Sequence, residues 1–354
     1  MRILIIGNSK SAEILTNFLS EDKNLLIFST KENTLGNFIN IAPDNVEELK
    51  EFALANEINL TIAADISLFN LDYLSVFNAN NLAILIPDNE ALKIASEKAF
   101  GKKFIYRNKI KTPKFAFFEK PALAIEYVRN SDFPVVIKPD EHSGTQTAYI
   151  AETFSAAKKQ IDKLFQNDNK KILIEEYIYG KELTYYVLSD GFNPILIDSI
   201  QTYRNELSIK GTNDKALDEK IYNEIIFPTI SSLAESGCEY TGVLGFDIII
   251  TPNNEAYLIE YNPFFKDLDI EIILKGTDEN WPKLFLDTII GTLTDNFETP
   301  FSIHKNDEYF GAFINTDDEI ISESARAKNT LKMKLLEEGL EKEVFDEAQK
   351  IWKI

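Results

Sequence analysis

The sequence contains very little cysteine and histidine. A single cysteine, Cys238, and two histidines, His142 and His304, occur among 354 residues. One cysteine cannot close a disulfide within the chain, and this set is too small for a typical zinc site. The sequence therefore argues against a disulfide-stapled fold and against zinc chemistry.

Positive charge is also scarce, and long hydrophobic runs are missing. The chain has 37 Lys and Arg against 57 Asp and Glu, a net charge of -20. Nucleic acids and anionic membranes attract proteins through Lys and Arg, so we expect neither as a partner. No stretch of the sequence approaches the roughly 18 apolar residues of a membrane span. The opening "MRILIIGNS" lacks the length of a signal peptide, so we expect a cytoplasmic protein.

The composition that is present indicates a globular protein of two or three domains or subdomains, since 44% of the 354 residues are hydrophobic. Over residues 1–90, short Ile/Leu runs such as "RILIIG" and "NLLIFS" alternate with amphipathic segments. This alternation predicts a doubly wound domain with a parallel sheet. "GNSKSAE" contains Gly7 but lacks the later glycines of a dinucleotide-binding turn, so NAD is not expected.

The rest of the chain predicts a helix and then two α+β units. A helix over residues 91–115 ends near Pro113. The first unit extends from "FPVVIKPD" to "KILIEEYI", and the second extends from "LTYYVLSDG" to the hairpin described next. From about residue 300 we expect the strand "YFGAFINT" and a charged helical tail that begins at Ser322.

The segment "GVLGFDIIITPNNEAYLIEYN" reads as a hairpin with an unusual pair of acids. With a turn at residues 252–255, Thr251 faces Ala256 and Asp247 lies opposite Glu260. Like charges in such a pair destabilise a sheet. Asn262 points to the same face as Glu260, so the three side chains would suit Mg²⁺. The alternative is a solvent-facing strand pair.

Three further polar features are weak when taken singly. Lys102 shares a helix with Lys98, and both would be solvated on an exposed helix face. Lys138 closes the apolar run "FPVVI", where it needs an anion or reaches solvent. In "ILIEEYIYGKE" a strand end offers backbone groups to an adenine edge, and Glu182 offers a carboxylate to a ribose; the alternative is an ordinary edge strand.

The order of these features resembles the ATP-grasp superfamily, and most closely the phosphoribosylamine-glycine ligases. The resemblance rests on "SEKAFGKKFIYRNKIKTP", "FPVVIKPD", "ILIEEYIYGKELT", "YTGVLGFDIII" and "YLIEYNPFFKDLD", which follow one another in that family's order. It extends from residue 1 to about residue 290. Each motif lies on the kind of element that its role requires.

The resemblance implies a fold of class α/β plus α+β, in which a doubly wound pre-ATP-grasp domain precedes a two-subdomain ATP-grasp core. The implied units are residues 1–92, the small subdomain with a linker helix at 93–182, the large subdomain at 183–298, and a C-terminal strand and tail at 299–354. The implied nucleotide-binding residues are Lys102, Lys138, Ser143, Gly144, Glu175, Glu176, Tyr177, Ile178 and Glu182. The implied magnesium ligands are Asp247, Glu260 and Asn262.

The sequence departs from the family in its substrate loops and in one charged residue. The phosphate-covering flap "DEHSGTQTAY" has a single glycine, and "GNSKSAE", "AADISL" and "YRNELSIKGTND" replace the family's substrate segments. Two residues after Asn262 the superfamily usually has an arginine that supports the transferring phosphoryl group, whereas this chain has Phe264. The candidates to replace that arginine as catalytic cations are Arg204, Lys210 and Lys266.

We therefore expect an ADP-forming ligase that joins a small carboxylate to an amine, with ATP and Mg²⁺ or Mn²⁺ as cofactors. Its expected partners are these small molecules, and it is expected to be a monomer or a homodimer. Three alternatives stay open. They are phosphoribosylamine-glycine ligase itself, a Mg-ATP-binding pseudoenzyme without turnover, and a structural protein whose acids and lysines are all solvated.

Overall fold

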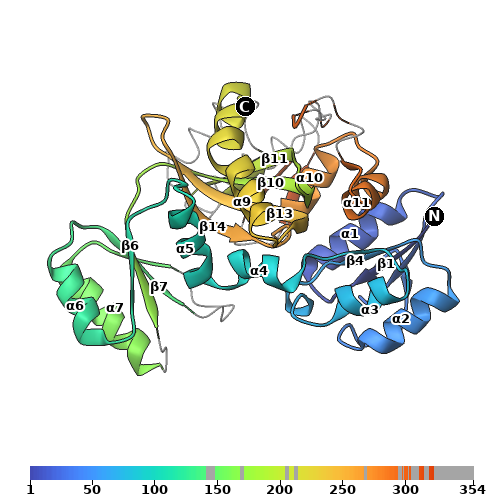
Figure 1. Cartoon of the computed structure of the whole chain (residues 1–354), viewed down its shortest axis with the longest axis horizontal. Coiled ribbons are helices and arrows are strands. Elements are labelled where there is room, and N and C mark those ends of the chain that lie inside the picture. Colours follow the sequence, from blue (N-terminus) through green and yellow to red (C-terminus); the bar gives the residue numbers. More distant parts are fainter. Residues whose placement is uncertain are drawn as a thin grey trace.

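The structure is a computed structural model of the chain. It describes residues 1–140, 148–167, 171–203, 207–210, 214–266, 269–293, 297, 299–301, 303, 311–314 and 319–322. Three β-sheets with their helices form an elongated molecule (Figure 1). The N-terminal sheet lies at one end, a four-stranded sheet lies at the other, and a seven-stranded sheet lies between them.

The N-terminal sheet has five parallel strands in the order β3-β2-β1-β4-β5. All four residues from Ile3 to Ile6 are fully buried, as expected for a parallel strand covered on both faces. The doubly wound N-terminal unit predicted from the sequence is thus confirmed, although β3 is too short to show a pattern. The elements are β1 (Arg2–Ile6), α1 (Lys10–Ser20), β2 (Leu26–Ser29), β3 (Asn37–Phe38), α2 (Val46–Ala55), β4 (Leu60–Ala63), η1 (Ile66–Leu68), α3 (Tyr73–Ala79) and β5 (Ile84–Leu85).

Two helices replace the single helix predicted over residues 91–115. The backbone of Glu97 is extended, with φ -119° and ψ 102°, and it ends the first helix and begins the second. Gly101 allows the two helices to pack closely, because a Cβ atom there would lie 2.3 Å from the carbonyl oxygen of Ile94. The break turns Lys102 into the protein, where it is 4% exposed. These helices are α4 (Asn89–Ser96) and α5 (Lys98–Arg107).

The four-stranded sheet is antiparallel, in the order β6-β9-β7-β8. Helices α6 and α7 cover one of its faces, where Ile137, Ile161 and Ile174 share a hydrophobic core. Lys138 and Glu175 alternate with those buried positions and so lie on the opposite face. The elements are β6 (Phe115–Phe118), α6 (Pro121–Arg129), β7 (Val135–Pro139), β8 (Tyr149–Ala151), α7 (Phe154–Gln166) and β9 (Ile172–Glu176).

The seven-stranded sheet is antiparallel, in the order β14-β13-β10-β11-β12-β15-β16. Successive residues of β10 enter different cores. Tyr185 packs with the helices on one face, whereas Tyr186 belongs to a core shared with the N-terminal sheet. The elements are β10 (Lys181–Gly191), β11 (Pro194–Tyr203), β12 (Leu207–Lys210), α8 (Lys215–Ile221), the π-helical turn η2 (Tyr222–Ile226), α9 (Phe227–Glu235), β13 (Tyr240–Ile250), β14 (Ala256–Asn262), α10 (Asp269–Lys275), α11 (Trp281–Ile290), β15 (Gly311–Ile314) and β16 (Glu319–Ser322).

Beyond residue 303 the structure describes only two strands. β15 lies within the predicted strand "YFGAFINT", and β16 pairs with it at the edge of the large sheet. The predicted helical tail after Ser322 lies outside the described residues, and the domain limits stay predictions. Among the residues that the structure describes, no helix is both long and apolar enough to cross a membrane.

We expect Gly101→Ala to lower the free energy of unfolding by about 1–3 kcal/mol, the usual cost of overpacking a tight contact. The added methyl group would press on the carbonyl of Ile94. Urea denaturation measures the effect. Lys103→Ala, an exposed change on the same helix, should stay within about 0.5 kcal/mol of the wild type. Equal stability of both variants would contradict the close contact between α4 and α5.

Candidate active site

The hairpin of β13 and β14 places Asp247 directly opposite Glu260, as the sequence predicts. The predicted register near the turn is wrong by one residue, because Ala256 pairs with Ile250 rather than with Thr251. A β-bulge between Asp247 and Ile248 restores the predicted pairing farther out. The acids therefore face each other because of the bulge, which could not be predicted by counting residues from the turn.

The bulge also gathers the polar side chains on one face of the hairpin. Leu258 and Tyr261 are three residues apart, yet both are buried in the same core. An extra residue between them reverses the alternation of β14. Glu260 and Asn262 consequently point away from that core, to the face that carries Asp247. This is the arrangement that a shared cation site requires.

Two lysines from different elements meet at one buried carboxylate. Lys102 Nζ of α5 lies 2.5 Å from Glu175 Oε1, and Lys138 Nζ of β7 lies 3.1 Å from Glu175 Oε2. The side chains of Lys102 and Glu175 are 4% and 3% exposed. Lys102 also donates to the Thr112 hydroxyl at 3.0 Å. The interpretation of Lys102 as a solvated helix residue is therefore wrong.

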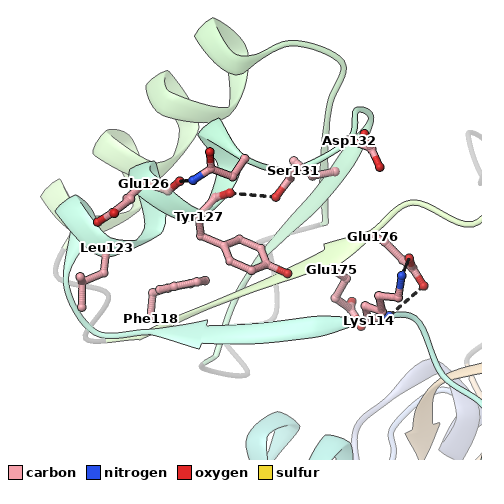
Figure 2. A pocket seen from close by; sticks show the side chains of 11 residues that line it. Lys114, Phe118, Leu123, Glu126, Tyr127, Ser131, Asp132, Glu175 and Glu176 are labelled. Carbon is pink, nitrogen blue, oxygen red and sulfur yellow. Dashed lines mark hydrogen bonds and ion pairs between the residues drawn. The ribbon is translucent and has the colours of Figure 1, made fainter.

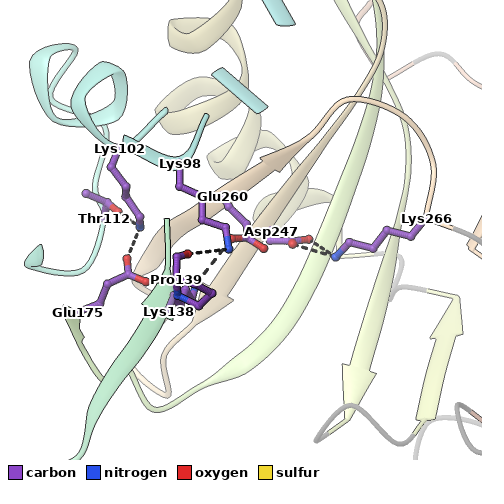
Figure 3. A network of polar contacts seen from close by, with 9 residues as sticks. All are labelled: Lys98, Lys102, Thr112, Lys138, Pro139, Glu175, Asp247, Glu260 and Lys266. Atoms are coloured by element: carbon purple, nitrogen blue, oxygen red, sulfur yellow. Dashed lines mark hydrogen bonds and ion pairs between the residues drawn. The ribbon is translucent and has the colours of Figure 1, made fainter. Parts of the chain in front are cut away.

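The same network continues to the hairpin (Figure 3). Lys138 Nζ lies 3.7 Å from Glu260 Oε2 and so links the small sheet to the large one. Lys98, treated in the sequence only as a neighbour of Lys102, donates to the carbonyl of Pro139 at 3.5 Å. The sequence missed Lys98 because its approach depends on the break between α4 and α5. Three lysines thus converge on Glu175 and Glu260.

The lysines of this network favour the ionised forms of its two carboxylates. Burial alone would raise the pKa of Glu260, but Lys138 and Lys98 lower it to about 2. Burial likewise opposes ionisation of Glu175, yet Lys102 and Lys138 hold its pKa below the usual range. Burial lowers the pKa of Lys98 and of Lys102, whereas Glu260 and Glu175 outweigh burial at Lys138 and raise its pKa. A cluster of three ammonium groups beside two carboxylates favours an anionic ligand such as a phosphate chain.

Lys266 occupies the other side of the acid pair. Its Nζ lies 2.7 Å and 2.8 Å from the two carboxylate oxygens of Asp247 and 3.3 Å from the Thr184 hydroxyl. Thr184 in turn donates to Asp247 at 2.7 Å. The side chain of Lys266 is 44% exposed. Of the three predicted replacements for the missing arginine, Lys266 is placed at the acid pair.

The other two replacements and part of the flap are not described. Arg204, Ser143 and Gly144 lie outside the described residues. For Lys210 the structure gives the backbone, at the end of β12, and not the side chain. These predicted roles stay predictions.

The strand end predicted to contact adenine leaves two residues outside the sheet. Glu176 is the last residue of β9, and its carboxylate accepts the backbone N–H of Lys114 at 2.9 Å. Within the described chain, the backbone groups of Tyr177 and Ile178 make no hydrogen bond to other backbone groups. Glu182 follows on β10 and is exposed. These backbone groups, unpaired with other backbone groups within the described chain, lie next to a carboxylate, as the predicted adenine and ribose contacts require.

The residues at the hairpin fit a magnesium ion. Two carboxylates and a carboxamide supply the hard oxygen ligands that Mg²⁺ prefers. Asn262 Nδ2 is buried without a hydrogen-bond partner among the described residues; as an amide donor it would pair with an acceptor such as a phosphate oxygen, whereas the oxygen of the same amide would face the cation. Among those same residues no cluster of three or more His, Cys, Asp or Glu exists, so a closed all-protein cage is not present there. An open site shared with phosphate oxygens suits this ligand set.

Phe264 has become part of the hydrophobic core. It is 3% exposed and packs edge-on against Phe69 of the N-terminal unit, with ring centroids 6.2 Å apart, and against Phe265 at 5.3 Å. The position at which the superfamily usually has an arginine therefore joins two parts of the molecule by apolar contact and offers no charge.

A cavity of about 340 Å³ lies between the N-terminal unit and the lysine network. Ser67 and Asn70 line it from the N-terminal side, and Lys98, Glu260 and Asn262 line it from the other side. A second cavity of about 550 Å³ lies beside α6, at the end of the small sheet (Figure 2). Only the first has, among its described lining residues, lysines of the network together with a hairpin acid, Glu260.

We expect Glu175→Gln to lower the free energy of unfolding at pH 7 by about 3 kcal/mol, because two buried ammonium groups lose their shared carboxylate. The pKa of Glu175 is depressed, so its stabilisation is present above the unfolded pKa of about 4.3 and is lost as pH falls through the folded pKa. The difference between variant and wild type should therefore narrow below about pH 4. Urea denaturation at several pH values measures it.

The control for this prediction is Glu57→Gln, which alters a surface ion pair with Arg2. The side chain of Glu57 is 82% exposed. Glu57→Gln should change the free energy of unfolding by less than about 0.5 kcal/mol at any pH. A Glu175→Gln protein as stable as this control would show that the buried network contributes little.

Comparison with known proteins agrees with the predicted resemblance. Residues 96–213 match the family described as "Phosphoribosylglycinamide synthetase, ATP-grasp (A) domain". The phosphoribosylamine-glycine ligase of Pasteurella multocida is 26% identical over 276 residues, which cover 72% of this chain and 63% of that ligase. The match thus spans less than two thirds of that relative.

Solved structures share the fold. The phosphoribosylamine-glycine ligase of Thermotoga maritima superposes with a TM-score of 0.72 at 17% identity, over 89% of this chain and 80% of that one. The biotin carboxylase domain of Hydrogenobacter thermophilus 2-oxoglutarate carboxylase, solved with MgADP, gives 0.65 at 14% identity, over 88% and 73% of the two chains. These matches show the fold and agree with the predicted resemblance. The chain has the ATP-grasp fold and resembles the phosphoribosylamine-glycine ligases.

Proposed function

We propose that this protein joins a small carboxylate to an amine, with ATP as the energy source and an acyl phosphate as the intermediate. The observation that carries the proposal is the single polar network that links Lys102, Lys138 and Glu260 across two sheets. It brings phosphate-binding cations and metal-binding acids together between the subdomains. That combination is what phosphoryl transfer needs, since catalysis there rests on positioning and charge.

Each part of the network has a distinct task in this proposal. Lys102 and Lys138 hold phosphate oxygens, and the free backbone of Tyr177 and Ile178 holds the adenine edge. Glu182 accepts ribose hydroxyl protons in hydrogen bonds. Asp247, Glu260 and Asn262 would hold Mg²⁺, which when bound neutralises charge on the phosphates.

The proposed reaction balances in two steps. An oxygen of the substrate carboxylate attacks the γ-phosphorus of ATP, and the bond from that phosphorus to the bridging oxygen breaks to release ADP. The amine nitrogen then attacks the acyl carbon, the bond from that carbon to the phosphate oxygen breaks, and the amine proton leaves with the phosphate. The products are an amide, ADP and hydrogen phosphate.

The cavity of about 340 Å³ is where we place the carboxylate. It opens onto Glu260 and Asn262, so a molecule within it would lie beside the proposed site of phosphoryl transfer. Lys98 on its wall offers an ammonium group that has no carboxylate within 4 Å among the described residues. Its volume suits a small molecule rather than a polymer.

Two related functions compete with this proposal. The similarity to phosphoribosylamine-glycine ligases favours that reaction itself, although the substrate loops of this chain differ from the family. The apolar setting of Phe264 favours a Mg-ATP-binding protein without turnover. ADP release with phosphoribosylamine and glycine, or with another acid and amine, separates the three.

We expect ATP and Mg²⁺ together to raise the melting temperature, because a ligand at one hundred times its Kd adds about 2.7 kcal/mol to stability. ATP alone or Mg²⁺ alone should raise the melting temperature much less. Glu260→Ala should abolish the part that requires Mg²⁺, while Glu255→Ala, on the same hairpin but paired with Lys111 at the turn, should keep it. No rise in the wild type at millimolar Mg-ATP would overturn the proposed function.

Once a substrate pair is found, Lys138→Ala should reduce ADP release by about 10²-fold or more, the usual effect of removing one charge-stabilising group. Coupled detection of ADP measures this rate. Lys158→Ala removes an exposed lysine paired with Asp162 on α7 and should keep the wild-type rate. Full activity of Lys138→Ala would mean that the phosphates bind elsewhere.

A further inference from the structure

Lys266 combines a backbone held by a buried hydrogen bond with a charged end on an exposed stem. Its backbone N–H donates to the Tyr186 hydroxyl at 3.2 Å, and that hydroxyl donates to Asp269 at 2.7 Å. Tyr186 is fully buried and Asp269 is 4% exposed. The side chain of Lys266, by contrast, is 44% exposed and ends on a long flexible stem. The ammonium group can therefore change partners while the backbone of Lys266 stays in place.

The present partner of that ammonium group is one of the proposed metal ligands. Lys266 contacts both oxygens of Asp247, as Figure 3 shows. A half-exposed ion pair of this kind is weak and gives way to a stronger cation. A divalent ion on Asp247 and Glu260 would compete with Lys266 for the same oxygens. Binding of one cation at Asp247 therefore disfavours binding of the other.

The site otherwise lacks the cation that the superfamily usually places there. Phe264 is packed against Phe69, so it cannot carry charge to the phosphates. Lys102 and Lys138 already contact Glu175, and Lys98 lies on the cavity wall, where it contacts the Pro139 carbonyl. A phosphoryl group in transfer spreads negative charge over its oxygens and is stabilised by a positioned cation. Lys266, displaced from Asp247, would be a free ammonium group at the required place.

Resting on the proposed function, we propose that Lys266 is the cation that supports the transferring phosphoryl group, and that it reaches this group by exchanging Asp247 for phosphate as Mg²⁺ takes Asp247. The exchange couples metal binding to the availability of the catalytic cation. A protein with ATP but no Mg²⁺ would keep Lys266 on Asp247 and stay inactive.

The first experiment measures binding without turnover. ADP binding is followed by calorimetry while Mg²⁺ is varied, for the wild type and for Lys266→Met, which keeps the length of the stem without its charge. The variant should reach half-saturation at a Mg²⁺ concentration at least about 5-fold lower than the wild type, because the competitor for Asp247 is gone. In an Asp247→Asn background, Lys266→Met should produce no such shift.

The matched control is Lys283→Met, at a surface lysine paired with Asp287 on α11. It should leave the Mg²⁺ dependence unchanged. Lys266→Arg provides a second variant that keeps the charge, and it should resemble the wild type. Melting temperatures measured in parallel show that each variant is folded.

The second experiment measures ADP release with an active substrate pair. Lys266→Met should lower kcat by about 10²-fold, and Lys266→Arg should recover most of that loss. An unchanged kcat would overturn the role in phosphoryl transfer, and an unchanged Mg²⁺ dependence would overturn the exchange. A wild type that does not bind Mg-ADP would instead overturn the proposed function, so the two failures are distinguishable.

Discussion

The buried carboxylate of Glu175 is the group on which the site depends, because two lysines from different elements share it. Removing charges from water is costly, and a buried pair repays that cost only when each charge has a close partner. Here Lys102 and Lys138 lie within 2.5 Å and 3.1 Å of the same side chain. The triad fixes α5 against the small sheet, and Lys138 extends the contact to Glu260 of the large sheet. One set of charges thus orients three parts of the chain.

A single extra residue in β14 determines how the large sheet joins that network. Without the bulge, Glu260 would lie on the same side as buried Leu258, inside the core. With it, Glu260 and Asn262 face the lysines, while Tyr261 fills the core beside Phe246. Bulges commonly redirect side chains next to functional sites. The hairpin therefore combines a hydrophobic face and a ligand face on a strand of seven residues.

The aromatic residues that follow the hairpin form apolar contacts between the N-terminal unit and the large sheet, and one of them, Phe264, stands where the superfamily usually has an arginine. Phe264 contacts Phe69, Phe265 contacts Tyr186, and Trp281 packs against Phe265. Together these rings continue the N-terminal core into the large sheet. The positive charge beside Asp247 comes from Lys266, two residues after Phe264, and the charge beside Glu260 comes from Lys138. Phe264 thus supplies the apolar contact, and Lys266, two residues later, supplies the charge.

The sequence by itself determined the parallel N-terminal sheet, because buried Ile/Leu runs are a short-range pattern. It also predicted that Asp247 faces Glu260, but that pairing depends on the bulge in β14, which the turn does not specify. It left two interpretations of Lys138, an ammonium group that needs an anion or one that reaches solvent, and the structure shows it in contact with Glu175. Only the tertiary structure decided that Lys102 is buried, that Lys98 joins the network and that Lys266, rather than a more distant residue, meets Asp247. Those outcomes depend on the break at Glu97 and on contacts such as that between Lys266 and Tyr186, eighty positions apart in the chain. Local patterns cannot encode them, since the energy of a buried charge is set by whichever groups the fold brings beside it.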